Sequence, residues 1–238
     1  MRSIVAATLV AVLITLGALS ARAQEDTDAR AEALVRKYRV IAFGSEYDPD
    51  PRPVQKWVGA VRIRVHGDTS YRGRAEALGV ELNGLTGLAI AVVETGGNLH
   101  LRMLPADEYF AFAEARTGGA LRRSIEARRS ACFGLAVVND RDEVIGGHAV
   151  VNLALAPIEI EACIVEEVTQ LVTGLFNDSN LPPRPSLFSD RYFHPKISAT
   201  DAIMIRAHFD PSLVPGMAAD AAIAIIRPLI RDAFAREP

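Results

Sequence analysis

The segment from Ile4 to Leu19 constrains this chain most, because it is too apolar to lie on the surface of a folded domain. Arg2 precedes the segment, and a small-x-small sequence at residues 21–23 follows it. A positive start, a short apolar run and a small-residue cleavage pattern are the three parts of a secretory signal peptide. The sequence therefore predicts that residues 1–23 are a signal peptide and that the rest folds in the periplasm or as a secreted protein.

An uncleaved membrane anchor is the alternative interpretation of this segment. The apolar run is shorter than the roughly 20 residues that a spanning helix needs, and a cleavage pattern follows it. No later segment has membrane length, and no cysteine lies near residue 20 for lipid attachment. We therefore expect no membrane span after signal cleavage.

The charge balance argues against nucleic acid as a partner. The chain has 26 Lys and Arg against 29 Asp and Glu, a formal net charge of −3. Binding to phosphates along a nucleic acid needs clustered basic residues. The arginine-rich stretch 122–129 is interrupted by Glu126 and is typical of a solvated helix face.

The chain has two cysteines, Cys132 and Cys163, and both lie after the signal peptide. An even number of cysteines in an oxidising compartment favours a disulfide. A bridge that closes a loop of roughly 30 residues stabilises the fold by about 3 kcal/mol, because it restricts the unfolded chain. Two separately buried thiols are the alternative, and a nucleophilic cysteine ranks third because neither has a histidine nearby in sequence.

The pattern of apolar and breaking residues divides the mature chain into two parts. Residues 24–53 predict an N-terminal helix and a proline-rich linker, and residues 54–238 predict a single domain. Within that domain, alternating apolar residues predict strands near 61–65, 88–93, 99–104, 133–138 and 144–155. Helices are predicted near 75–85, 105–115, 157–172, 202–209 and 217–234. Because strands and helices do not alternate strictly, we expect the α+β class.

The familiar catalytic motifs are missing from the sequence. It contains no G-x-S-x-G, no P-loop and no G-x-G-x-x-G after a strand. Its five histidines are scattered, and no two lie four residues apart on a predicted helix. This excludes a standard zinc site built on helical histidine spacing.

The most unusual polar residues lie on the predicted helix 157–172, where Glu166, Glu167 and Gln170 interrupt an otherwise apolar run. Glu166 and Gln170 are four residues apart and share a face, whereas Glu167 points about 100° away. Buried carboxylates need solvent, a cation or hydrogen-bond donors. The simpler alternative is an exposed polar stripe opposite an apolar core face. His148, in the predicted hairpin, is a weaker candidate for facing this helix.

Five stretches of the sequence occur in a specific order between residues 82 and 217. They are Leu82-Asn83-x-Leu85-Thr86-Gly87-Leu88, Cys163 to Gln170, Gly174-Leu175-Phe176-Asn177-Asp178-Ser179, Ser186-Leu187-Phe188-Ser189-Asp190, and Asp210-Pro211 to Gly216-Met217. In this order they resemble an uncharacterised proteobacterial family of exported proteins, the domain-of-unknown-function family DUF2927. No single stretch is decisive, but together they cover more than half of the mature chain.

That family is similar in layout to zincin metallopeptidases of the metzincin type. The resemblance implies a mixed sheet, an active-site-type helix that carries H-E-x-x-H, a glycine turn with a third ligand, and a helical C-terminal part. In this register Glu167 matches the general base, and Glu166 and Gln170 replace the two histidines. Asn177 or Asp178 falls near the third ligand, and the hairpin ending at 149–155 supplies the strand at the edge of the sheet. Gly174 lies one residue later than the peptidase spacing.

The replaced histidines have a chemical consequence. Zinc prefers nitrogen and sulfur ligands, whereas Glu166, Gln170 and Asp178 offer oxygens, which suit calcium or another divalent cation better. Without zinc, Glu167 has no metal-bound water to deprotonate. We therefore expect no cofactor and no hydrolysis, and instead a domain that binds an envelope or periplasmic protein or peptide.

Two alternatives stay open. The first is a metallopeptidase-like hydrolase in which Glu166, Gln170 and Asp178 bind calcium or another divalent cation and Glu167 is the base. The second is a purely structural envelope protein whose polar helix stripe is solvated.

Overall fold

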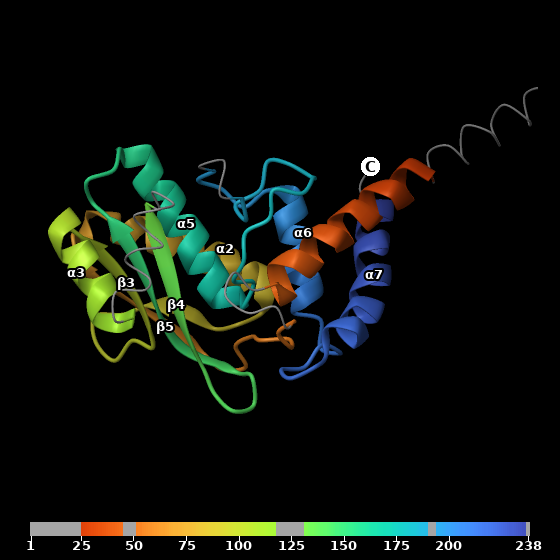
Figure 1. Ribbon diagram of the computed structural model, residues 1–238, viewed down its shortest axis with the longest axis horizontal. Helices are drawn as coiled ribbons and strands as arrows, with labels where there is room; N and C mark the ends of the chain where they lie inside the picture. Colours follow the sequence, from red (N-terminus) through yellow and green to blue (C-terminus); the bar gives the residue numbers. More distant parts are fainter. Residues whose placement is uncertain (1–24, 45–50, 118–130, 190–193, 237–238) are drawn as a thin grey trace, which may run out of the picture.

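The computed structural model describes residues 25–44, 51–117, 131–189 and 194–236 (Figure 1). The predicted signal peptide, residues 1–23, lies outside these ranges. The same is true of the arginine-rich stretch 122–129 and of part of the predicted linker, residues 48–50.

A mixed sheet of five strands forms the centre of the molecule, in the order β2-β1-β3-β5-β4. The strands are β1 (Val61–Gly67), β2 (Ile90–Val92), β3 (Leu99–Leu104), β4 (Cys132–Val138) and β5 (Val144–Asn152). Neighbouring strands are parallel except β4, which runs antiparallel to β5. This sheet with its helices is consistent with the predicted α+β class, and the predicted hairpin is confirmed as β4 and β5.

The position of the hairpin in the sheet corrects one expectation. The second hairpin strand, β5, was expected at the edge, but it pairs with β3 on one side and with β4 on the other. The edge strand is therefore β4. The physical reason is that β5 finds a parallel partner in β3, which leaves the antiparallel strand outermost.

The two faces of the sheet follow the alternation in the sequence. On one face Ile63, Leu101 and Ala149 are fully buried in the main core. Helices α2 (Arg72–Thr86) and α5 (Pro157–Thr173) cover this face, as Figure 1 shows. The opposite face is partly covered by α3 (Ala106–Thr117), which packs in a smaller cluster with β4 and β5.

Local signals fix the ends of the helix that carries the predicted site. Helix α5 begins with Pro157, whose missing N–H needs no partner in a first turn. The backbone N–H of Ala156 donates to the Glu159 carboxylate at 2.9 Å. The helix ends at Gly174, which has a φ of 79°. The predicted helix is thus confirmed. It could be predicted because these start and stop signals act within a few residues.

The C-terminal part is helical, as predicted, and consists of α6 (Ala199–His208) and α7 (Ala219–Arg236). At the start of α6, the Asp201 N–H donates to the Ser198 hydroxyl at 3.2 Å, and the Ser198 N–H donates to the Asp201 carboxylate at 3.1 Å. This reciprocal pair is a capping box. None of the described helices is long and apolar enough to cross a membrane.

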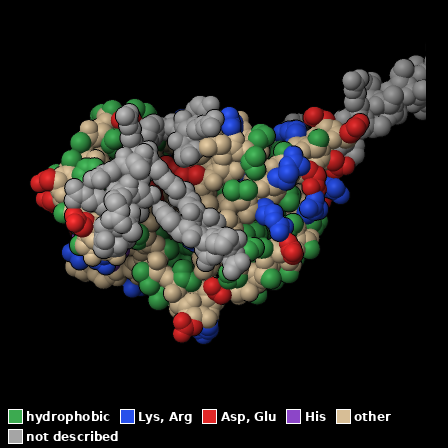
Figure 2. Space-filling model, viewed as in Figure 1, with side chains coloured by type: hydrophobic (Ala, Val, Ile, Leu, Met, Phe, Trp, Pro, Cys, Tyr) green, Lys and Arg blue, Asp and Glu red, His purple; other side chains and the backbone are tan. Residues whose placement is uncertain are grey.

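The N-terminal helix, residues 25–43, packs on the domain. Its side chains Leu34, Tyr38 and Ile41 are fully buried and belong to the main core. At its surface Arg39 pairs with Asp220 of α7 at 2.7 Å. Acidic and basic side chains are interspersed at this end of the molecule (Figure 2). The helix is therefore part of the folded unit.

A buried hydrogen bond between Tyr38 and His208 makes this packing sensitive to acid. The Tyr38 hydroxyl donates to Nδ1 of His208 at 2.7 Å, and His208 Nε2–H donates to the Gln55 carbonyl at 3.4 Å. The bond from Tyr38 needs a neutral imidazole, because a protonated ring has no nitrogen left to accept it. Burial, followed by the charge of Lys56, lowers the pKa of His208 to about 3.

We expect the protein to lose stability as the pH falls below the unfolded histidine pKa of about 6.5. In that range His208 is protonated in the unfolded chain but stays neutral in the folded protein. Above that pH, the contribution of His208 to the free energy of unfolding is fully present. It should decrease by about 2 kcal/mol between pH 7 and pH 5, as measured by urea unfolding at each pH. In His208→Gln this share of the pH dependence should vanish, and an unchanged slope in the variant would refute the assignment.

Candidate functional site

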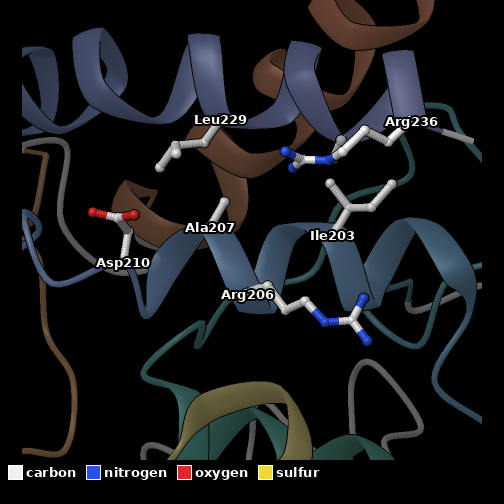
Figure 3. Close-up of a pocket in the computed structure, with 7 residues that line it drawn as sticks. Ile203, Arg206, Ala207, Asp210, Leu229 and Arg236 are labelled. Atoms are coloured by element: carbon white, nitrogen blue, oxygen red, sulfur yellow. The ribbon is translucent and has the colours of Figure 1, made fainter.

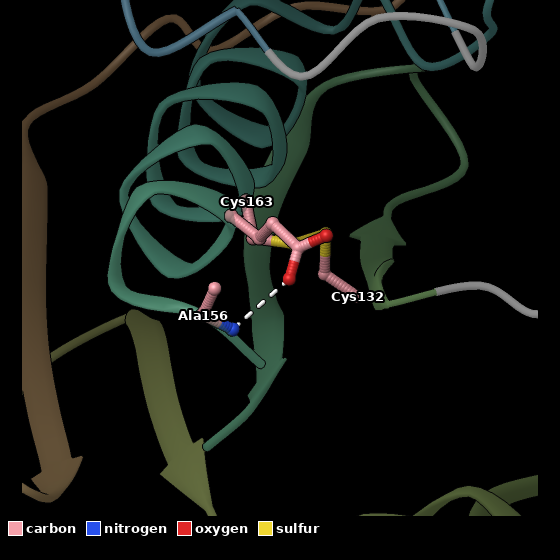
Figure 4. Close-up of a disulfide and its surroundings, with 4 residues drawn as sticks. Cys132, Ala156 and Cys163 are labelled. Atoms are coloured by element: carbon pink, nitrogen blue, oxygen red, sulfur yellow. Dashed lines mark hydrogen bonds between the residues drawn. A yellow bond between two sulfur atoms is a disulfide. The ribbon is translucent and has the colours of Figure 1, made fainter. Parts of the chain in front are cut away.

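The predicted site lies where α5 crosses the edge of the sheet. The disulfide between Cys132 of β4 and Cys163 of α5 joins the two elements, which confirms the predicted pairing (Figure 4). Helix α5 packs on both β4 and β5. One turn after Cys163, Glu167 reaches Gly134 of β4. A methyl group at Gly134 would lie 2.9 Å from Glu167 Oε2, so the lack of a side chain there makes room for the carboxyl group.

Glu167 is the most perturbed group of the site. Only 5% of the residue is exposed, and among the described residues its Oε2 has no hydrogen-bond partner. Burial raises the pKa of Glu167 well above its ordinary value, and the charge of Asp178 raises it further. A carboxyl group that is buried next to a second carboxylate favours its neutral form. Burial and the neighbouring charge of Asp178 therefore both favour the protonated form of Glu167.

Gln170 and Asp178 are brought together as the sequence predicted. Gln170 lies on the next turn of α5 and donates from Nε2 to Asp178 Oδ1 at 2.8 Å. Asn177, the other candidate for this position, donates to the Ile41 carbonyl at 3.1 Å and turns toward the N-terminal helix. Of the two alternatives, Asp178 is thus the one that lies beside Gln170 and close enough to Glu167 to affect its pKa.

The polar stripe on α5 is largely buried. Glu166 is half-buried, whereas Glu167 and Gln170 are buried with only 5% and 8% exposed. On the same helix Val168 and Leu171 belong to the core, as the sequence pattern predicts. A fully solvated stripe would leave Gln170 exposed, so the burial of these side chains needs another explanation.

The donor set does not fit zinc. The described residues include no group of three or more His, Cys, Asp and Glu that could share a metal ion. Gln170 uses its amide N–H to bond Asp178 Oδ1, so one of the oxygens that would hold a cation is occupied by an internal donor. An amide and two carboxyl groups also lack the nitrogen or sulfur ligands that zinc prefers. These residues supply hydrogen bonds and charge, and no metal-bound water follows from them.

Lys37 is a residue near this site that sequence reasoning missed. It is fully buried on the N-terminal helix and donates to the Pro183 carbonyl at 3.0 Å. Burial lowers the pKa of Lys37, whereas the charges of Asp201 and Asp178 raise it. The sequence feature that could have identified it is its position among the core residues Leu34, Tyr38 and Ile41 of the same helix.

The expected approach of His148 to this helix is wrong. His148 lies on β5 with its ring stacked on His100, at 5.0 Å between ring centroids, on the sheet face opposite α5. The reason is the alternation along the strand, which places Ala149 in the main core and turns His148 away from it.

A separate pocket of about 380 Å³ lies between α6 and α7. Ala207 and Leu229 face each other across it, and Arg206 points away from α7 (Figure 3). None of the residues predicted for the site lines this pocket. It is therefore distinct from the arrangement around Glu167.

The comparisons with known proteins identify a family without an assigned activity. The family described as "Protein of unknown function (DUF2927)" matches residues 31–228. The matched range includes the sheet, α5 and the loop that carries Asp178. No curated protein and no solved structure matches the chain. Since the match covers most of its length, the chain belongs to the DUF2927 family.

Proposed function

We propose that this chain is an exported, zincin-like binding domain that holds an extended peptide of an envelope or periplasmic partner along β4 without hydrolysing it. One observation carries the proposal. The buried Glu167 carboxyl group lies against the edge strand with an oxygen that no described residue binds, and the donors around it do not fit zinc.

The arrangement of elements supports the zincin-like part of the proposal. In metzincin-type enzymes a strand lies beside the helix that carries the site, and a glycine turn leads to a further ligand. Here β4 lies beside α5, Gly174 ends that helix, and Asp178 follows the turn. The helix positions that hold imidazoles in those enzymes carry Glu166 and Gln170 in this chain.

The edge of the sheet supports the peptide-binding part. Among the described strands β4 pairs only with β5, so its outer backbone groups have no strand partner. An exposed edge accepts an added strand through main-chain hydrogen bonds. A peptide strand on β4 would pass Gly134, and therefore the Glu167 carboxyl group.

The protonation state of Glu167 favours binding over cleavage. A general base must be ionised to take a proton from water, and in zincins that water is bound to the metal. Burial and then the charge of Asp178 raise the pKa of Glu167, and both therefore disfavour the ionised form that a general base needs. A neutral carboxyl group has an O–H that can donate to the carbonyl of a bound peptide.

A library of unstructured synthetic decapeptides, incubated with the full mature chain and analysed by mass spectrometry, tests this proposal. We expect a subset to be retained and recovered intact. Gly134→Val should abolish retention because its side chain enters the space of Glu167. The control Val80→Lys changes an α2 residue that is 75% exposed and should bind normally. Cleaved peptides, or no retained peptide at all, would contradict the proposal.

Replacing Glu167 with Gln should stabilise the protein at neutral and alkaline pH. Because its pKa is raised in the folded state, Glu167 ionises less readily there than in the unfolded chain. Its contribution to the free energy of unfolding is therefore fully present below the unfolded pKa of about 4.3 and is lost as the pH rises. Gln cannot ionise, and we expect Glu167→Gln to gain about 2 kcal/mol in free energy of unfolding at pH 8.

Urea unfolding at pH 4 and pH 8 measures this effect, and the gain should be confined to the higher pH. Glu161→Gln is the matched control, because Glu161 is an exposed carboxylate on the same helix. Equal effects of the two substitutions at pH 8 would contradict a buried, neutral Glu167.

A hydrolase with an oxygen-rich metal site is the second candidate function. Gln170 and Asp178, two of the three predicted ligands, lie side by side, but a cation would have to displace the Gln170 amide N–H from Asp178 Oδ1. This alternative predicts that Glu166→Ala weakens calcium or manganese binding without unfolding the chain. Calorimetric titration of both metals into the two proteins decides the matter, and an unchanged titration in the variant removes this candidate.

A further inference from the structure

Three histidines form a row on the sheet face opposite α5. His66 of β1, His100 of β3 and His148 of β5 lie on adjacent strands, and His100 is directly opposite His148 in the strand register. His66 Nε2 lies 3.0 Å from His100 Nδ1, and the rings of His100 and His148 stack at 5.0 Å. All three side chains are half-buried, so they are held in place and still reach solvent.

Arginines surround this histidine row. Arg102 donates from Nε to His148 Nδ1 at 3.2 Å, and its guanidinium lies 4.9 Å from the centre of the Phe112 ring. Arg116 of α3 lies 5.1 Å from the same ring. Two guanidinium groups are therefore held at one aromatic ring, although their charges repel each other.

The electrostatic surroundings of the row are positive. Burial and then the charge of Arg102 lower the pKa of His66 and of His148, each to about 4, and the same two causes lower that of His100. The other charged groups that act on them, among the described residues, are Arg64, Arg116 and the neighbouring histidines. Within the described ranges, none of the causes of these shifts is a carboxylate. At neutral pH the row thus presents neutral imidazoles beside guanidinium charges.

This composition selects an anion over a metal ion. A divalent cation would be repelled by the arginines, and His66 and His100 already use one nitrogen each on their mutual contact. Guanidinium groups bind tetrahedral oxyanions through several parallel N–H donors, and imidazole N–H groups add further donors.

We propose that the face formed by Arg64, His66, His100, Arg102, Arg116 and His148 is a binding site for a phosphate group. The site lies on the sheet face opposite Glu167 and does not depend on the function proposed for Glu167. Its ligand is a phosphate dianion or diphosphate, either free in solution or carried on a lipid head group.

A bound anion offsets the repulsion from the arginines and raises the pKa of the histidines. Among the described residues, the cationic groups that act on the histidines are Arg64 on β1, Arg102 on β3 and Arg116 on α3. Because a phosphate group also gains a proton as the pH falls, the titrations of site and ligand act on the affinity in opposite directions.

Calorimetric titration of the full mature chain with pyrophosphate tests the site. Arg102→Gln should weaken binding about tenfold or more at pH 5.5. Arg141→Gln is the matched control, because Arg141 lies on the β4–β5 turn with its side chain 78% exposed. As a second measurement, pyrophosphate should shift the NMR signals of His66, His100 and His148 and leave the buried His208 unchanged.

Vesicles distinguish the source of the phosphate group. Sedimentation with phosphatidic acid vesicles, and not with phosphatidylcholine vesicles, would assign the site to a phosphate group carried on a lipid. Binding to pyrophosphate alone would assign it to a free ligand. The proposal is overturned if neither probe binds, or if Arg102→Gln and Arg141→Gln weaken binding equally.

Discussion

Gly174→Ala is expected to lower the free energy of unfolding by about 4 kcal/mol, the largest effect of any single substitution considered. Gly174 ends α5 with a φ of 79°, a conformation that strains any residue with a side chain. A methyl group there would lie 1.8 Å from the Gln55 carbonyl oxygen and 2.7 Å from its carbon. Because the colliding atoms belong to the backbone, the turn and the segment before β1 must move apart.

Gly87→Ala is the matched control for this prediction. Gly87 ends α2 with a φ of 73°, but nothing lies within 4 Å of the position of its added methyl group. It should therefore cost only about 1 kcal/mol, the strain of the left-handed backbone alone. Denaturant unfolding of the two variants measures the difference, and similar losses would show that Gln55 does not abut the end of α5.

Replacing both cysteines by serine should lower the free energy of unfolding by about 3 kcal/mol. The bridge joins Cys132 and Cys163 across a sequence separation of 31 residues. Its loss removes a restriction on the unfolded chain and so lowers the free energy of that state. Guanidinium unfolding with and without a reducing agent gives the measurement. Reduction should lower the free energy of unfolding of the wild-type protein and leave that of the double variant unchanged.

The disulfide also joins the edge strand β4 to the helix that carries Glu167. If reduction left the stability of the wild-type protein unaltered, Cys132 and Cys163 would not be holding β4 against α5. This link matters for the proposed function, because β4 supplies both the edge for the peptide and the glycine beside Glu167.

The local elements of this fold could be predicted from the sequence. The proline and glycine at the ends of α5, the Ser198 cap of α6 and the apolar alternation of β3 are signals that act within a few residues. Each signal belongs to one element and does not depend on its neighbours. The disulfide was predictable for a different reason, since two cysteines have one possible pairing.

The order of the strands could not be predicted in the same way. Whether β5 pairs with β3 or lies at the edge depends on contacts between segments far apart in sequence. The alternation along β5 predicts that His148 and Ala149 lie on opposite faces of the sheet. It does not predict which of the two faces α5 covers. The histidine row was missed for this reason, because its members come from three separate strands.

The site was predicted in part. The sequence singled out Glu167, Gln170 and Asp178, and the fold brings these three together beside β4. Their burial was not predictable, because a polar stripe on an apolar helix is equally consistent with solvent exposure. The burial of Glu167 is what connects the structure to the proposed function, because burial disfavours the ionised carboxylate.

Zinc content of the purified mature chain shows whether the residues around Glu167 hold a catalytic metal. After exhaustive dialysis without a chelator, mass spectrometry of metals should find no stoichiometric zinc, because an acid, an amide and an aspartate replace the imidazoles around Glu167. Stoichiometric zinc that is retained by the wild-type protein and lost from Gln170→Ala would contradict the account.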